Sequence, residues 1–455
     1  MSQPSSSDSS SSLEKAYLAI ASDDEGRLCD DIPDAACDQQ PQNFFLHVLS
    51  LTLTKLADAF VDPKLILSWL LTQIGAASGL VALLVPIREA GALLPQLFIA
   101  RWVRQRAVRK WVWIIGSVFQ GIAAIGMVLS FSLLSGNLAA WSVLILLTIL
   151  AVSRSLCSLS YKDVLGKTVS SSSRGSATGL ASSIAATGTL LLAFILTAKL
   201  FSDIYLTLLF CLGIAGLFWL FGALSFSFIV ETPGTTEGGK NALEDFKVHL
   251  KKISEQSMLQ RFIIVRALFT ATAFAPPFML MLGQHKLSDY ATISEIINDV
   301  SWSGISQLGL LIFASASASL LSSYTWGRLA DQSSQSVLTY SGLISSVSLV
   351  SLIIISLVFP QLLQNLFVLP LLLFGLMIGY QGIRLGRSIH LVNITDDDNR
   401  AHFTAISNTA IGFVLISGSS FGLIAHWMGT LWVVGIFASM CILGTWYSLK
   451  LKDSE

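Results

Sequence analysis

Five ionisable side chains stand inside long apolar stretches of this chain, and their types limit the chemistry that it can do. They are Lys55, Asp58, Arg88, Glu89 and Arg154. A charge inside a bilayer is costly unless it has a partner or faces water. Such groups can lock helices together as ion pairs, or a carboxylate can exchange its basic partner for a proton during transport. Both interpretations stay open from the sequence.

The two acids among them have different neighbours. Asp58 has Lys55 one helical turn away, which favours a permanent ion pair. Glu89 lies midway along its apolar segment between Pro86 and Pro95, which can open the segment to water. We therefore expect Glu89 to be the better proton carrier and Asp58 to be the better lock.

We expect the pairs Lys55/Asp58 and Arg88/Glu89 to lie at similar depth, because the first apolar segment ends at the outer surface and the second begins there. Together with Arg154, an expected anion partner, they form the candidate pathway for a solute or a proton.

Prolines predict bends in three apolar segments: Pro63 in the first, Pro86 and Pro95 in the second, and Pro276 and Pro277 in the seventh. We expect Lys64, directly after the first of these, to lie near the outer end of its segment. It should also point away from the helical face that carries Lys55 and Asp58.

The elements that must position these side chains are membrane helices. The chain has 455 residues, of which 53% are hydrophobic and 12% charged, and its mean hydropathy is +0.69. An ordinary soluble domain is roughly 25% charged. The formal net charge is zero, with 28 basic and 28 acidic residues, which argues against a nucleic-acid partner.

Twelve apolar segments of roughly 20 residues recur between residues 44 and 449, the length a helix needs to cross the hydrocarbon core. They predict an all-α polytopic membrane protein. We expect an N-terminal six-helix bundle over residues 44–230, a cytoplasmic linker over 231–261 and a C-terminal six-helix bundle over 262–449. Residues 1–43 predict a disordered acidic, serine-rich tail, and 450–455 a short cytoplasmic C-terminus.

Basic residues between the segments gather on one side of the predicted topology. The loop after the tenth segment, which we place at 363–383, contributes Arg384 and Arg387, and the loop before the fifth contributes Lys167 and Arg174. The positive-inside rule therefore places both termini in the cytoplasm and the protein in the cytoplasmic (inner) membrane.

The two halves carry a short internal repeat. Leu165-Gly166-Lys167-Thr168-Val169 matches Leu385-Gly386-Arg387-Ser388-Ile389, and each copy precedes the fifth segment of its half. Repeated halves joined by a cytoplasmic linker are typical of secondary transporters.

Between the eighth and ninth segments lies Trp326-Gly327-Arg328-Leu329-Ala330-Asp331. Its Gly-x-Leu-Ala-Asp string resembles the signature loop of the major facilitator superfamily. The resemblance extends over residues 44–449 through the number of segments, the orientation and the repeat. It implies twelve transmembrane helices in two six-helix repeats, with Gly327, Arg328 and Asp331 at the cytoplasmic gate.

The first-half copy, Arg101 to Lys110, departs from that pattern, since Gln105 stands where the family has aspartate and Val108 replaces a glycine. The departure puts the usual first-half charge relay in doubt. We expect the second-half copy to dominate the gate.

These observations predict a proton-coupled secondary transporter of a small solute that works by alternating access, and not an enzyme. The expected partners are the solute, protons or another coupling ion, and membrane lipids, with no nucleic acid, no cofactor and no metal; the expected state is a monomer. Two alternatives remain open on the same scaffold: a receptor or assembly protein that does not transport, and a lipid flippase. A substrate is not predicted.

Overall fold

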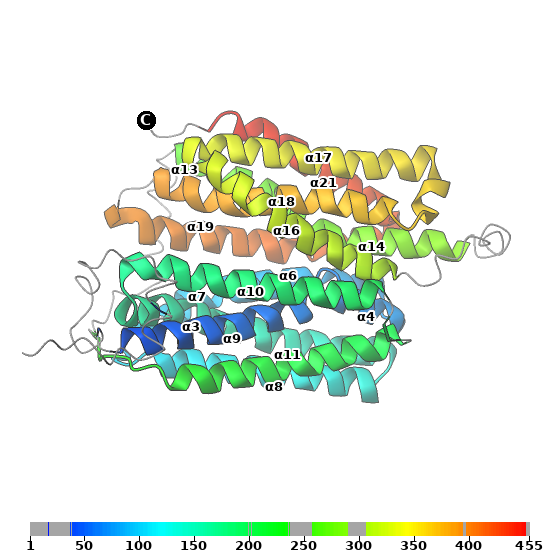
Figure 1. The fold of residues 1–455 in the computed structure, drawn as a ribbon. Coiled ribbons are helices and arrows are strands. Elements are labelled where there is room, and N and C mark those ends of the chain that lie inside the picture. Colours follow the sequence, from blue (N-terminus) through cyan, green and yellow to red (C-terminus); the bar gives the residue numbers. More distant parts are fainter. Residues whose placement is uncertain are drawn as a thin grey trace, which may run out of the picture.

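The computed structural model describes residues 17, 37, 39–198, 200–201, 203–234, 236, 257–289, 306–394 and 397–451. Within these ranges the regular structure is helical, and the helices form two bundles that lie side by side with their axes roughly parallel (Figure 1). Both bundles pack into a shared apolar core.

The N-terminal bundle contains α3 (Gln40–Phe60), α4 (Ile66–Gln73), α5 (Ser78–Ala82), α6 (Leu84–Leu93), α7 (Pro95–Arg104), α8 (Lys110–Leu133), α9 (Gly136–Thr168), α10 (Ser171–Thr197) and α11 (Ile204–Ser227). The C-terminal bundle contains α13 (Ser257–Leu268), α14 (Ala271–Asp289), α16 (Gln307–Gln332), α17 (Ser334–Val358), the short 3-10 helix η1 (Pro360–Gln364), α18 (Val368–Asn393), α19 (Asp397–Ser417), α20 (Ser420–Met428) and α21 (Thr430–Ser448).

Nine helical stretches of the described chain are long and apolar enough to cross a membrane. Three further helical stretches correspond to the remaining predicted crossings: α3 with α4, α5 to α7, and α16, of which Gln307–Ser322 is apolar. The described helices are thus compatible with the twelve predicted crossings.

Two of the three predicted bends lie at their prolines. The first crossing breaks between α3 and α4 around Pro63, and in the second Pro95 is the first residue of α7. The seventh crossing differs, because Pro276 and Pro277 lie inside α14 and the break comes earlier, between Leu268 and Ala271. A proline ring disturbs the turn before it, so the break belongs on the N-terminal side of the pair.

The outward faces are apolar, as a lipid environment requires. On α8, Trp111, Ile115, Phe119 and Ile122 are exposed and follow one another at three or four residues, so they form one stripe. The opposite face of α8 is buried and rich in small residues, which lets neighbouring helices approach closely.

The two bundles touch at the end of the molecule where α10 ends and α16 begins. The backbone N–H of Ser306 donates to the carbonyl of Thr197 at 2.9 Å. Gly309 lies so close to the backbone of Leu196 and Thr197 that an added Cβ would overlap it. At the same end, Gly422 on α20 packs against Gly79 on α5. These contacts close one end of the interface between the bundles.

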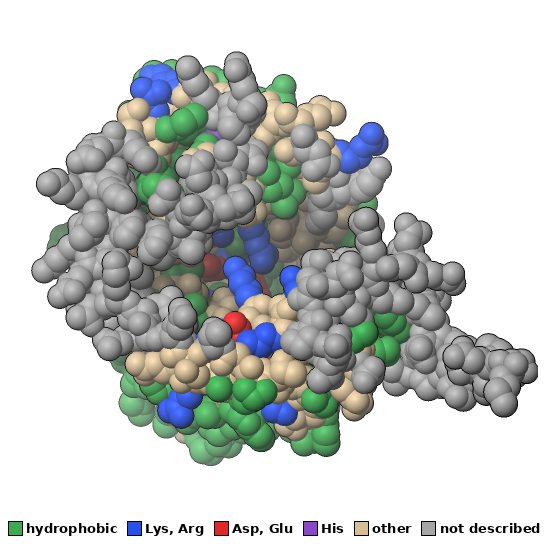
Figure 2. Space-filling view, turned by 90° about the vertical axis from the view of Figure 1, so that its left-hand side faces the viewer, with side chains coloured by type: hydrophobic (Ala, Val, Ile, Leu, Met, Phe, Trp, Pro, Cys, Tyr) green, Lys and Arg blue, Asp and Glu red, His purple; other side chains and the backbone are tan. Residues whose placement is uncertain are grey.

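Among the residues that the structure describes, no contact closes the opposite end of the interface. Figure 2 views the molecule from the end that carries the C-terminus and shows a hollow between the bundles with basic and acidic side chains inside it. By the positive-inside prediction, this end faces the cytoplasm.

The predicted tail, residues 1–43, lies mostly outside the described residues, so its disorder stays a prediction. Tyr17 is an exception: its ring is buried edge-on against Phe44, and its hydroxyl hydrogen-bonds the hydroxyl of Ser173 at 2.9 Å. Helix α3 already begins at Gln40, whose side chain contacts the same hydroxyl. This short part of the tail is therefore attached to the N-terminal bundle.

Candidate functional site

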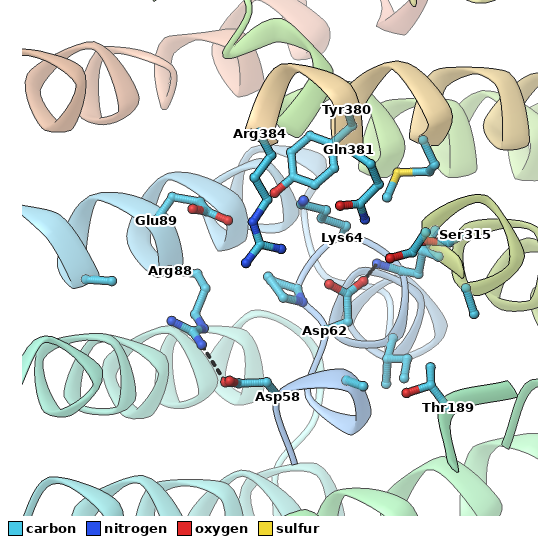
Figure 3. A pocket seen from close by; sticks show the side chains of 18 of the residues that line it. Asp58, Asp62, Lys64, Arg88, Glu89, Thr189, Ser315, Tyr380, Gln381 and Arg384 are labelled. Atoms are coloured by element: carbon cyan, nitrogen blue, oxygen red, sulfur yellow. Dashed lines mark hydrogen bonds and ion pairs between the residues drawn. The ribbon is translucent and has the colours of Figure 1, made fainter. Parts of the chain in front are cut away.

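A cavity of about 490 Å³ lies between the bundles and is lined by both of them. The N-terminal bundle contributes residues from the α3–α4 break, α6, α9 and α10, and the C-terminal bundle contributes α16 and α18. The volume lies in the range of sites that hold small metabolites. Figure 3 shows labelled side chains from both bundles around this space.

Asp58 on α3 is the centre of an ion-pair network in the cavity. Its carboxylate oxygens lie 2.7 Å from the Arg88 guanidinium on α6 and 2.7 Å from the Arg154 guanidinium on α9. Three helices of the N-terminal bundle are therefore joined by one carboxylate. The sequence had suggested pairs of neighbours along the chain, Lys55 with Asp58 and Arg88 with Glu89, and the structure shows different partners.

Lys55 is not among the residues that line the cavity. Its ammonium group contacts the hydroxyl of Ser182 on α10. It still lies within electrostatic reach of Asp58, Arg154 and Arg384. Lys55 therefore lies near the charged groups of the site without lining the cavity.

The break between α3 and α4 brings Asp62 and Lys64 into the cavity. Asp62 accepts a hydrogen bond from the backbone N–H of Leu65 at 3.0 Å, so its carboxylate helps to end the turn before α4. The Lys64 side chain is buried, and its ammonium group lies 3.6 Å from the ring centroid of Tyr380 on α18. The prediction that Lys64 points away was wrong, because the break resets the helical phase after Phe60.

Glu89 faces the same space from α6. It forms no ion pair with any described residue, yet Lys64, Arg88, Arg384 and Arg387 all lie within its electrostatic reach. In Figure 3, Glu89, Lys64 and Arg384 project into the cavity from three different elements. The carboxylate is thus shared among several cations.

Arg384 and Arg387 also line the cavity, although the sequence assigned them to a cytoplasmic loop. Helix α18 continues to Asn393, well past the end of the apolar segment at 383. Both residues are therefore still on a helix, and this helix faces the N-terminal bundle. Hydropathy locates the apolar part of a helix and not its end. The spacing of three residues was the available signal, since it places both guanidiniums on one helix face.

The signature loop lies at the open end of α16. Trp326 is buried and donates from its indole N–H to the carbonyl of Ile378 at 3.0 Å. A Cβ at Gly327 would meet nothing within 4 Å among the described residues, so the structure shows no close helix approach that depends on this glycine. Arg328 is exposed, and the side chain of Asp331 lies outside the described residues. The gating role of these three residues stays a prediction.

The first-half loop carries a charge network of its own. Asp163 pairs with Arg109 and with Lys167, the latter at 2.8 Å. Glu231, whose side chain is fully buried, pairs with Lys167 at 3.1 Å and accepts the backbone N–H groups of Arg109 and Lys110 at 2.9 and 2.7 Å. The loop therefore has a charge network without an aspartate at Gln105, because Asp163 and Glu231 supply the acids.

No cluster of three or more His, Cys, Asp or Glu side chains suited to a metal ion occurs in the part of the chain that the structure describes. The chemistry that the cavity offers is recognition by charge, by hydroxyl groups and by apolar contacts.

No protein-family model matches the chain, and no curated protein matches it in sequence. Solved structures match its fold. A mutant of the nucleoside transporter NupG superposes with a TM-score of 0.66 at 12% identity, over 90% of this chain and 99% of that chain. A D-xylose-proton symporter superposes with a TM-score of 0.60 at 15% identity, over 90% of this chain and 97% of that chain. A POT family transporter in complex with 5-aminolevulinic acid gives 0.61 at 11% identity, over 90% and 95%. The predicted fold class, an all-α polytopic membrane protein, is confirmed, and the described helices are compatible with two repeats of six crossings.

Proposed function

We propose that this chain, a multi-pass membrane protein with the fold of the major facilitator superfamily, is a secondary active transporter of a small solute. One observation carries the proposal: a charged cavity between the two bundles is open at one end and closed at the other. Alternating access needs such a site at the interface of two rocking bundles. We further propose that the open end is cytoplasmic and that the membrane is the cytoplasmic (inner) one.

The closed end supports a rocking motion, because the bundles meet there through short-range contacts between small residues. The contact between Thr197 and Ser306 and the close approach at Gly309 must separate when this end opens. Opening there, with closure near Gly327 to Asp331, gives the second state of the cycle.

Proton coupling is part of the proposal and assigns a role to Glu89. A carboxylate that no single base neutralises can gain a proton when a solute takes its cations, and can lose the proton when the solute leaves. Asp58, with two close guanidiniums, is better suited to hold the N-terminal bundle together.

The test cross-links the two bundles at the closed end. Backbone contact places Thr197 and Ser306 within reach of a disulfide, so Thr197→Cys with Ser306→Cys should cross-link the bundles on oxidation. Solutes that raise the melting temperature of the purified protein are then assayed for uptake into proteoliposomes, with and without an imposed pH gradient. Oxidation should stop uptake, and a reductant should restore it.

A matched control pair lies within one bundle. Ser130 and Ser142 have hydroxyl oxygens 2.7 Å apart on α8 and α9, so Ser130→Cys with Ser142→Cys should cross-link without affecting transport. Ligands that bind but are never moved would indicate a receptor. Movement of a labelled phospholipid in place of every soluble solute would indicate a flippase.

A further inference from the structure

The charges that line the cavity do not balance. Five basic side chains, Lys64, Arg88, Arg154, Arg384 and Arg387, face three acidic ones, Asp58, Asp62 and Glu89. The lining therefore carries an excess of two positive charges, whereas the whole chain has 28 basic and 28 acidic residues.

The acids are already engaged, and the excess is divided: one positive charge lies in the Asp58 network and one on α18. Asp58 serves Arg88 and Arg154, and Asp62 accepts a backbone N–H beside Lys64. Arg384 and Arg387 form no ion pair with a described residue. Of the acidic side chains that line the cavity, Glu89 is the one that remains to them, and it is shared with Lys64 and Arg88.

The cavity wall on α18 is graded along its length. Met377 lies toward the closed end, Tyr380 follows one turn later, and Arg384 and Arg387 lie toward the open end. At about 1.5 Å per residue, this stripe is about 15 Å long. Ile66 and Ile312 add apolar surface from α4 and α16. A ligand with one apolar end and one anionic end matches this wall.

Resting on the transporter proposal, we infer that the cavity binds a small organic anion, a carboxylate or phosphate with an apolar body. The anionic group lies among Arg384, Arg387 and Lys64, and the apolar body points toward the closed end. Guanidinium groups suit such oxygens because they donate paired N–H groups in one plane.

The anion and Glu89 then use the same cations. When the anion is bound, Glu89 loses part of its positive surroundings, and a proton on Glu89 can replace them. The substrate class thus gives a physical reason for moving an anion together with a proton.

The experiment measures ligand affinity on the purified full chain with matched pairs of probes: phenylacetate with phenylacetamide, adipate with adipamide, and inorganic phosphate alone. At least one carboxylate should raise the melting temperature while its uncharged amide does not. Arg384→Gln and Arg387→Gln should each weaken that carboxylate's affinity by at least about tenfold, since charge-assisted hydrogen bonds are the strong ones. Arg384→Lys should recover part of the loss.

Arg261→Gln is the control, because it removes one positive charge from an exposed position at the start of α13 and should leave the affinity unchanged. Equal binding of the amide, stabilisation by inorganic phosphate alone, or no stabilisation by any anion would overturn the inference. Uptake of the same probes separates it from the transporter proposal. A carboxylate that binds through Arg384 and Arg387 but is not moved supports the anion site and refutes transport. Uptake of uncharged solutes alone supports transport and refutes the anion site.

Discussion

Lys167 and Arg387 occupy the same place in the two copies of the internal repeat, but their surroundings differ. Lys167 is held by Asp163 and Glu231, at 2.8 and 3.1 Å, and lies away from the cavity. Arg387 lines the cavity and forms no ion pair with a described residue. Lys167 has two carboxylate partners in the first-half network, whereas Arg387 has none among the described residues and faces the cavity.

The difference separates stability from recognition. An ion whose partners are all in the protein contributes to holding helix ends, and removing one partner leaves a buried charge without compensation. A cation that faces a cavity contributes little to packing but can bind something from outside. Substitutions in the first-half network should therefore mainly lower stability, and substitutions at the cavity should mainly lower transport.

Glu231→Gln should have the largest effect on stability. The substitution removes the charge that Lys167 and two backbone N–H groups share in a fully buried position, at a cost of about 3 kcal/mol. The melting temperature of the purified protein should fall by several degrees, while the affinity for a bound solute in the folded fraction stays the same. An unchanged melting temperature would show that the network does not hold α8, α9 and the linker together.

Asp58→Asn should have an intermediate effect and should affect both properties. It leaves Arg88 and Arg154 without their shared carboxylate, which should cost about 2 kcal/mol and should also reduce transport. Asp58→Glu, the charge-conserving control, should recover most of the stability. If Asp58→Asn lowers transport with no change in melting temperature, Asp58 is a coupling residue and not a lock.

Glu89→Gln should cost less stability than Asp58→Asn, about 1 kcal/mol, because Glu89 has no ion pair to a described residue and Arg88 keeps Asp58 as its partner. Net proton-driven transport should fail, while exchange of solute for solute should persist, since exchange needs no proton release. Both activities and the melting temperature are measured on one preparation. Loss of both activities in a destabilised protein would make Glu89 structural.

Gln105→Ala should have the smallest effect, because the side chain is exposed and the acids of the first-half network are Asp163 and Glu231. Its second-half counterpart, Asp331→Asn, should lose most transport at nearly normal expression if the signature loop is the cytoplasmic gate. Small, equal effects in a transport assay would reduce Gly327–Asp331 to the last turns of α16, with no role in gating.

The sequence was sufficient for the helical membrane fold and for the bends at Pro63 and Pro95, because apolar length and proline geometry are local properties. The described helices are also compatible with the predicted twelve crossings. It also indicated that Asp58, Arg88, Glu89 and Arg154 share one region, which the cavity lining supports. The partners of Asp58 could not be predicted, since they come from three helices. Lys64 was misplaced because a helix break has no fixed angle.

Arg384 was misplaced for another reason. The lipid boundary that hydropathy detects does not coincide with the end of α18, which continues for ten residues beyond the predicted segment. A basic residue in such an extension satisfies the positive-inside pattern and still faces the cavity. When a helix extends beyond the membrane, counting basic residues by loop therefore assigns cavity-lining residues to the loop.

The position of Glu231 has a consequence for the order of events during synthesis. Glu231 lies just after α11, the last helix of the N-terminal bundle, and its carboxylate fastens the start of α8 beside the end of α9. A chain that leaves the ribosome from its N-terminus completes this fastening before any helix of the C-terminal bundle exists. The first bundle should then be able to assemble as a finished unit during translation and to serve as the surface on which the second bundle folds.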